Sequence, residues 1–325
     1  MRFLQAFVLS AMLALLAGCS QNGVHKTLSR SLPSVGDQDA TVLAVYQPWF
    51  GSSDHINVGY SAQDPGVLEK QVRQAKDFGI AGFVVDWYDK RRPDFDHTYA
   101  MLQGIAAREN FKTALMYDEP EGEPESSTQD AIVALDYAHN RYFGPDAANG
   151  DAYLRFNGRP VVFVWPRSKR TNWDAVRQHL NQWETQPVLI LRYSNTAYAR
   201  DFDGFYAWVN PGEKGWAPDG SNWGKSYLDD FYHKMETQHP NKLIIAGVWP
   251  GFDDSRASWG SHRKISQRCG RTFQDTMAEF RHNMSPDHPI PYLLIETWND
   301  YEEGTAIERG IQRCSSNDYG PISTP

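Results

Sequence analysis

The sequence is poor in the residues that mark several common classes of protein. Only 3 of its 325 residues are Cys and 10 are His. No Cys-x-x-Cys, His-x-His or His-x-x-x-His spacing occurs, which argues against a structural zinc site and against a metal-dependent hydrolase. Lys and Arg number 32 against 40 Asp and Glu, whereas a nucleic-acid-binding surface normally carries a basic excess. We therefore expect no metal, no cofactor and no nucleic-acid partner, and the sequence identifies no protein partner.

The N-terminal apolar run is too short to cross a bilayer comfortably, which takes about 20 residues. It extends from residue 3 to residue 17 after Arg2, as in a signal peptide, and ends in Leu16-Ala17-Gly18-Cys19. This ending resembles a bacterial lipobox, in which cleavage precedes a cysteine that is then acylated. We expect a signal peptide at 1–18, a lipid-anchored Cys19 and a polar tether at 19–40. The alternative is an ordinary cleavage site followed by a chance cysteine.

The residues after the lipobox bear on location. Ser20 and Gln21, rather than Asp, follow Cys19. By resemblance to enterobacterial-type lipoproteins, this predicts that the chain is held at the outer membrane of a bacterial envelope. In such an oxidising compartment Cys269 and Cys314 are expected to pair in a disulfide, although two free thiols are the alternative.

Apolar and aromatic residues, in contrast, are abundant. Hydrophobic residues make up 41% of the chain, and its aromatic residues comprise 11 Trp, 16 Tyr and 16 Phe. Aromatic faces can stack on sugar rings, but a large core uses the same residues, so composition alone leaves both readings open.

From residue 41 onward, β-type apolar runs alternate with amphipathic segments. We expect strands at 41–46, 80–87, 111–117, 160–165, 188–192, 202–208, 243–249 and 292–298. We expect helices at 67–78, 99–109, 129–141, 173–183, 227–236 and 271–283, with a doubtful one at 194–201. The alternation predicts a single (β/α)8 barrel over residues 41–325, with no second domain. An open doubly wound sheet is the alternative, but no Gly-x-Gly-x-x-Gly or Walker pattern supports it.

Carboxylates and aromatic residues recur at the C-terminal ends of the expected strands, where barrel enzymes carry their active sites. Stacking platforms beside acids are what a carbohydrate cleft needs. The expected substrate-binding residues are Tyr46, Trp49, Asp86, Trp87, Tyr88, Tyr117, Asp118, Trp208, Trp249, Asp254, Glu296, Trp298 and Asn299.

The most specific cluster is Asn299-Asp300-Tyr301-Glu302-Glu303. If a helix starts at Asp300, then Asp300 and Glu303 share one face at i and i+3. Two close carboxylates separate their pKa values, which leaves one as an acid and one ionised. The alternative is purely structural: Asp300 caps a helix and Glu303 completes a capping box.

Residues 298–308, Trp-Asn-Asp-Tyr-Glu-Glu-Gly-Thr-Ala-Ile-Glu, resemble the motif of glycoside hydrolase families 99 and 71. Residues 79–88 and 250–254 agree with it. Family 99 comprises endo-α-mannosidases and mannanases, and family 71 comprises α-1,3-glucanases. The resemblance implies a (β/α)8 barrel and an endo-acting α-glycosidase whose partner is a polysaccharide.

The resemblance also implies roles for two residues. Glu303 matches the general acid/base, and Asp300 matches the carboxylate thought to assist attack by the sugar 2-OH. The endomannosidase pattern reads Asn-Glu-Trp-His-Glu, so Asp300, Tyr301 and Glu302 depart from it. The run Asn-Asp-Tyr-x-Glu at 299–303 is closer to the α-1,3-glucanase form, whereas Gly-Thr-x-Ile-Glu at 304–308 is closer to the mannosidase form, so the sequence stands between the two families. We therefore expect an envelope-anchored hydrolase of α-mannan or α-glucan. The alternative is a non-catalytic polysaccharide-binding or export lipoprotein.

Overall fold

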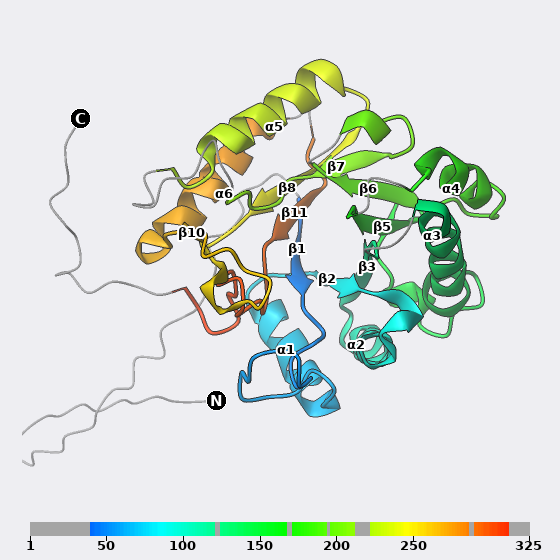
Figure 1. Cartoon of the computed structure of the whole chain (residues 1–325), viewed down its shortest axis with the longest axis horizontal. Helices are drawn as coiled ribbons and strands as arrows, with labels where there is room; N and C mark the ends of the chain where they lie inside the picture. Colours follow the sequence, from blue (N-terminus) through cyan, green and yellow to red (C-terminus); the bar gives the residue numbers. More distant parts are fainter. Residues whose placement is uncertain are drawn as a thin grey trace, which may run out of the picture. The chain divides into compact units, whose positions relative to one another are not determined.

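Figure 1 shows a computed structural model of the chain, which describes residues 40–120, 124–167, 171–193, 196–211, 222–285 and 289–311. Eight parallel strands pair in a closed ring, because β3 pairs with β5 and β11 pairs with both β8 and β1. The strands of the ring are β1 (Thr41–Tyr46), β2 (Gly82–Trp87), β3 (Lys112–Asp118), β5 (Arg159–Trp165), β6 (Val188–Arg192), β7 (Gly204–Tyr206), β8 (Leu243–Val248) and β11 (Tyr292–Ile295).

Helices surround this ring (Figure 1). They are α1 (Pro65–Asp77), α2 (Pro93–Glu109), α3 (Pro124–Ala138), α4 (Trp173–Leu180), α5 (Lys225–Gln238) and α6 (Arg271–Asn283). The arrangement is a (β/α)8 barrel, so the prediction of fold is confirmed and the open-sheet alternative is wrong. In the described part of the 194–201 connection the only helix is the short 3-10 turn Thr196–Tyr198.

Three short strands lie outside the ring. β4 (Arg155–Phe156) forms an antiparallel hairpin with β5, and β9 (Phe252–Asp253) pairs with β10 (Lys264–Ile265) beyond the end of β8. The second hairpin encloses the loop that carries Trp259. The eighth ring strand is shorter than the expected 292–298, because the backbone N–H of Thr297 bonds to Thr305 and the chain turns back on itself.

Local sequence explains where the first helix begins. Asp64 accepts a hydrogen bond from the N–H of Gly66 at 2.7 Å, and Pro65 occupies the first helical position. The buried residues of α1 follow the helical spacing i, i+3, i+4 and i+7, which turns one face of the helix toward the sheet. They are Leu68, Gln71, Val72 and Ala75.

Alternation along the strands decides which side chains enter the barrel, because successive residues point to opposite faces. In β2 the carboxyl of Asp86 points inward, whereas Trp87 points outward and donates from Nε1 to Asp96 of α2 at 3.0 Å. Trp87 lies in register with Tyr117 of β3, so Tyr117 points outward too. The same parity turns Asp118 inward.

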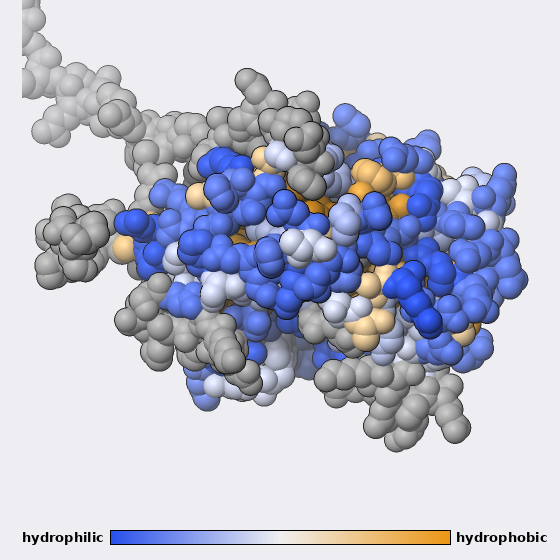
Figure 2. All heavy atoms as spheres, turned by 90° about the horizontal axis from the view of Figure 1, so that it is seen from above, coloured by the Kyte–Doolittle hydropathy of each residue, from blue (hydrophilic) through white to orange (hydrophobic). Residues whose placement is uncertain are grey.

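The outer surface is largely hydrophilic (Figure 2). Among the described residues, the large hydrophobic side chains that are exposed are Val133 and Trp259. No helix in the described part of the chain has both the length and the apolar character to cross a membrane. The expected signal peptide, Cys19, the tether to residue 39, and Cys314 lie outside the described residues. Cys269 is disulfide-bonded, and its pairing with Cys314 stays a prediction.

Candidate functional site

The segment after β11 forms a turn over residues 301–304 rather than the expected helix. Oδ1 of Asp300 accepts hydrogen bonds from the backbone N–H groups of Glu302 at 3.0 Å and Glu303 at 2.9 Å. The N–H of Asp300 donates to Oγ1 of Thr297 at 2.7 Å. Asp300 thus holds its own turn, but no capping box forms, because the Glu303 side chain does not return to the Asp300 N–H.

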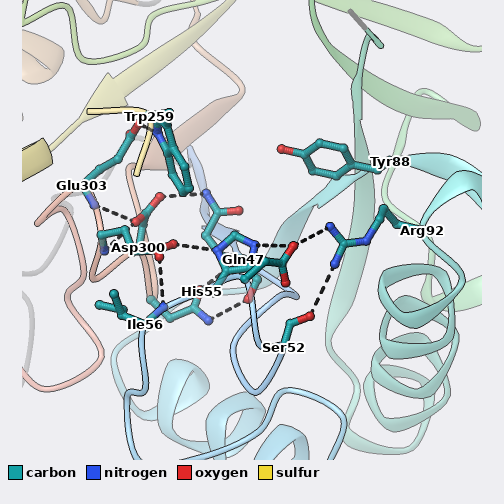
Figure 3. Close-up of polar contacts among 12 residues, drawn as sticks. Gln47, Ser52, His55, Ile56, Tyr88, Arg92, Trp259, Asp300 and Glu303 are labelled. Carbon is teal, nitrogen blue, oxygen red and sulfur yellow. Dashed lines mark hydrogen bonds and ion pairs between the residues drawn. The ribbon is translucent and has the colours of Figure 1, made fainter. Parts of the chain in front are cut away.

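Gln47, directly after β1, ties this turn to the barrel. Its N–H donates to Oδ1 of Asn299 at 2.8 Å, and its carbonyl accepts from Asn299 Nδ2 at 2.9 Å. Its side-chain Nε2 donates to Oδ2 of Asp300 at 3.3 Å (Figure 3). Asn299 therefore positions the chain, and Gln47 is a site residue that the sequence prediction omitted. Its place at the end of the first strand was the available signal.

Glu303 is half-buried and bonds to an exposed tryptophan. Nε1 of Trp259 donates to Oε1 of Glu303 at 3.3 Å (Figure 3). The loop that carries Trp259 is held by Asp254, whose carboxylate accepts from the N–H groups of Ser261 at 3.1 Å and Arg263 at 2.6 Å. Asp254, expected to bind substrate, instead orders this loop, and Trp259 is a second residue that the sequence prediction omitted.

The neighbouring carboxylate of Glu302 points elsewhere. It contacts Nδ1 of His55 at 2.8 Å and accepts from the N–H of Ile56 at 3.1 Å. The ring of His55 stacks on Trp49 with centroids 4.8 Å apart, and Trp49 meets Trp259 edge-on at 6.1 Å. Glu302 therefore anchors an aromatic wall of Trp49, His55 and Trp259 next to Glu303.

A second group of charges lies at the ends of β2, β3 and β5. Arg167 pairs with both carboxylate oxygens of Asp118, and its Nη2 donates to the hydroxyl of Tyr88 at 3.3 Å. Oδ1 of Asp86 is buried and has no hydrogen-bond partner among the described residues. In Figure 3, Tyr88 points its hydroxyl toward the side of the barrel where Asp300, Glu303 and Trp259 lie.

The two groups act on each other. Burial raises the pKa of Asp86 well above its usual range, and the charges of Asp118, Asp300 and Glu303 raise it further. Asp118, Asp300 and Glu303 thus lie within electrostatic reach of Asp86, and we call these four residues the carboxyl cluster. Burial also raises the pKa of Glu303, and it raises that of Asp300, where the charge of Glu303 adds to it.

The location of the proton within the pair follows from its hydrogen bonds. Asp300 accepts from two backbone N–H groups and Gln47, all of which favour its ionised form, whereas Glu303 accepts from Trp259 alone. Because two close carboxyls resist double ionisation, this difference in hydrogen bonds favours the arrangement in which Asp300 is ionised and Glu303 carries the proton. A proton donor beside an ionised carboxylate is an arrangement suited to general acid/base chemistry.

Four of the expected binding residues do not reach the carboxyl cluster, because they point outward between the sheet and the helices. Tyr46 donates its hydroxyl to Gln71 of α1 at 2.8 Å, and Trp298 packs against Phe78 and Phe83. Trp87 and Tyr117 lie beneath α2 and α3 on the same outer face. For Tyr46, Trp87 and Tyr117 the physical reason is strand parity, which overrides their position at a strand end, whereas Trp298 lies beyond β11, where the chain has already turned.

The remaining three expected residues lie on the β6–β8 side. Trp208 meets Trp165 edge-on with centroids 4.9 Å apart, and Trp249 is fully buried, with Nε1 donating to the carbonyl of Trp223 at 2.9 Å. Glu296 is fully buried and accepts from the N–H of Val209. A Cβ on Gly247 would lie 2.5 Å from Oε1 of Glu296, so only glycine leaves room for this carboxyl.

Burial raises the pKa of Glu296 well above its usual range, because its fully enclosed position disfavours the charged form. Within the described part of the chain, no three His, Cys, Asp or Glu side chains are arranged to hold a metal ion.

Comparisons with known proteins agree on one family. The model of glycosyl hydrolase family 99 matches residues 18–322. The glycoprotein endo-α-1,2-mannosidase of Mus musculus is 23% identical over 301 residues, which are 83% of this chain and 60% of that protein. The glycoprotein endo-α-1,2-mannosidase-like protein of Danio rerio is 22% identical over 278 residues, which are 78% of this chain and 58% of that protein. The chain thus spans about 60% of the length of these curated relatives.

Solved structures show the same fold. A family 99 endo-α-mannosidase from Bacteroides thetaiotaomicron, in complex with Bis-Tris-propane, superposes with a TM-score of 0.62 at 20% identity, over 84% of this chain and 87% of that one. A glycoside hydrolase-like protein gives a TM-score of 0.61 at 15% identity, over the same shares of the two chains.

Proposed function

Because the chain belongs to glycosyl hydrolase family 99, we propose that it hydrolyses α-linked glycans of the α-mannan or α-glucan type by carboxyl acid/base catalysis. The observation that carries the proposal is the pair of carboxyls on one turn. Glu303 is half-buried and burial raises its pKa, while Asp300 is buried and held by three hydrogen bonds.

In the proposed reaction Glu303 gives its proton to the glycosidic oxygen as the bond between that oxygen and the anomeric carbon breaks. Asp300 accepts a proton from the attacking group, which is either a water or the 2-OH of the same sugar. The backbone hydrogen bonds to Asp300 keep its carboxylate in place. No cation is needed for this, and a cation next to the carboxylate would lower its basicity.

The opposite side of the carboxyl cluster is proposed to hold the sugar. Asp86 has a buried oxygen without a partner among the described residues, and sugar hydroxyls are donors that could fill it. Tyr88 and Asp118 are fixed by Arg167, so they offer a hydroxyl and a carboxylate in set positions. Trp49 and Trp259 supply aromatic faces beside Glu303.

The reaction is tested by incubating the purified full chain with α-mannan, α-1,3-glucan and native bacterial envelope polysaccharide, followed by analysis of the products. Proton NMR of the first product anomer separates inversion from retention. Glu303→Gln should abolish release of products, while Glu236→Gln, on the exposed surface of α5, should not. Binding of a polysaccharide with no products from the wild type would instead favour the non-catalytic binding alternative.

We also propose that Cys19 carries lipid and anchors the chain in the envelope, which rests on the apolar run and the lipobox that precede it. Wild-type protein expressed in a bacterium should incorporate labelled fatty acid and sediment with the outer membrane. Cys19→Ala should do neither. A wild type without label would contradict the anchor and leave the glycosidase proposal intact.

A further inference from the structure

A cavity of about 440 Å³ lies between the end of β6 and α5. Its lining includes Arg192, Trp208, Asn210, Tyr227, Asp230 and Lys234. The volume and the aromatic walls suit a sugar unit, because pyranose faces stack on indole and phenol rings.

Arg192 is the distinctive group in this cavity. It pairs in register with Tyr206, whose hydroxyl contacts Met116 inside the barrel, so Arg192 also points inward. Its guanidinium lies over the ring of Trp165 at 3.8 Å. Among the described residues no carboxylate or carbonyl forms a hydrogen bond or ion pair with it.

The contrast with Arg167 shows that this lack of a partner is unusual. Arg167, on the other side of the barrel, is neutralised by both oxygens of Asp118. Arg192 instead keeps its positive charge unmatched in a partly buried position, which costs free energy unless a ligand supplies an anion.

The other charges of the cavity do not neutralise Arg192. Asp230 accepts from Lys234 at 2.9 Å and from the hydroxyl of Tyr193 at 2.8 Å, so its charge is already matched. Glu296, which lies within electrostatic reach of Arg192, is fully buried, and burial raises its pKa well above its usual range. It accepts a hydrogen bond from the N–H of Val209, and it forms no ion pair with Arg192.

Arg192 also connects the cavity to the chemistry. Arg192 is the last residue of β6, so it lies on the rim of the barrel where the C-terminal strand ends place Asp300 and Glu303. Its charge is among those that lower the pKa of Glu303, so the guanidinium lies within electrostatic reach of that carboxyl.

We propose that this cavity is a subsite for an acidic sugar unit, whose carboxylate, sulfate or phosphate group is bound by the guanidinium of Arg192. The inference rests on the proposed glycosidase function and narrows its substrate to an anionic α-linked glycan. The planar guanidinium can bind such an oxyanion with two parallel hydrogen bonds while it stays stacked on Trp165.

Binding measurements separate this inference from turnover. Calorimetric titration of the Glu303→Gln protein uses three matched pairs of probes: oligogalacturonides and their carboxyl-reduced form, phosphomannan and its dephosphorylated form, and sulfated and unsulfated mannan. At least one acidic probe should bind more tightly than its neutral partner, and the pair that shows the preference identifies the anion.

Arg192→Met in the same background should weaken binding of that acidic probe about tenfold to a hundredfold, the value of a charged hydrogen bond, and leave the neutral partner unchanged. Arg192→Lys keeps the charge and should restore part of the preference. Lys70→Met removes one exposed positive charge from α1 and should change the affinity for neither the acidic probe nor its neutral partner. Thermal melts verify folding, and Arg192→Gln replaces the Met variant if that variant does not fold.

The inference is overturned if no acidic probe is preferred, or if the preference survives the loss of Arg192. Failure of the wild type to cleave any glycan would instead contradict the proposed function, since the binding experiment needs no cleavage.

Discussion

Acidic residues at two places on the barrel rim have different surroundings. On the turn after β11, Asp300 accepts from backbone amides and Glu303 from an indole, and no cation forms an ion pair with either within the described residues. At the ends of β2, β3 and β5, Asp118 is paired with Arg167, and burial is the largest influence on the pKa of both Asp86 and Asp118. The first arrangement keeps a proton available for transfer, and the second fixes a charge in place. Both groups of acidic residues lie at strand ends, so the residues that contact each carboxyl decide its role.

The largest expected effect tests this difference directly. Glu303→Gln removes the proton donor and should lower kcat on an unactivated glycan by about 10² to 10⁴. Asp86→Asn should raise KM about tenfold and change kcat little, because a binding hydrogen bond acts on ground state and transition state alike. Steady-state kinetics on the substrate identified above provide the measurement. Equal losses of kcat in both variants would remove the distinction between the two sides.

A second experiment probes the fixed charge of Asp118. Arg167→Met should lower the free energy of unfolding by about 2 kcal/mol at pH 8, because a buried carboxylate loses its partner. The loss of Arg167 also raises the pKa of Asp118, so acid pH protonates the carboxyl and the deficit should shrink at pH 5.

Urea denaturation at the two pH values measures this change. Arg73→Met is the control, because Arg73 pairs with Glu69 and Glu109 on the exposed surface, where such pairs contribute about 0 to 1 kcal/mol. An equal loss in both variants would show that Asp118 does not depend on Arg167.

A smaller effect sharpens the role of the indole. Its hydrogen bond favours ionised Glu303 and lowers the pKa of that carboxyl. Trp259→Phe keeps an aromatic ring but removes the donor, so the pKa of Glu303 should rise. Since the acid form is the active one, the alkaline limb of the pH–rate profile should move to higher pH. A shift to lower pH would mean that Trp259 acts on another group.

The last effect, which acts on stability and not on turnover, concerns Glu296, the first carboxyl after β11. Its pKa is raised in the folded chain, so folding binds a proton, and this contribution to stability is lost as pH rises from the unfolded pKa through the folded one. Glu296→Gln has no such proton to lose. Its unfolding free energy should therefore improve relative to wild type as pH increases from 4 to 8, which urea denaturation at several pH values measures. A constant difference across this range would show that Glu296 is ionised in both states.

Much of the site could be predicted from sequence because barrel topology gathers the C-terminal ends of all eight strands on one rim. Asp86, Asp118, Asp300 and Glu303 were named on that basis, and the structure places them in one cluster. Gln47 was visible at the end of the first strand, but a neutral amide carries no chemical signal of its own. Trp259 lies ten residues after the end of the expected strand 243–249, so its position in the sequence did not indicate a place in the site.

The sequence by itself determined the fold and the pair Asp300 and Glu303, because strand and helix periodicity and a local motif are written in consecutive residues. Only the tertiary structure decided which aromatic residues face the acids. Tyr46, Trp87 and Tyr117 turn outward, since a shift of one residue along a strand moves a side chain to the opposite face, and Trp298 turns outward in the segment beyond β11. It also decided that Arg192 stays unmatched while Arg167 is paired, because charge balance depends on contacts between strands far apart in the chain.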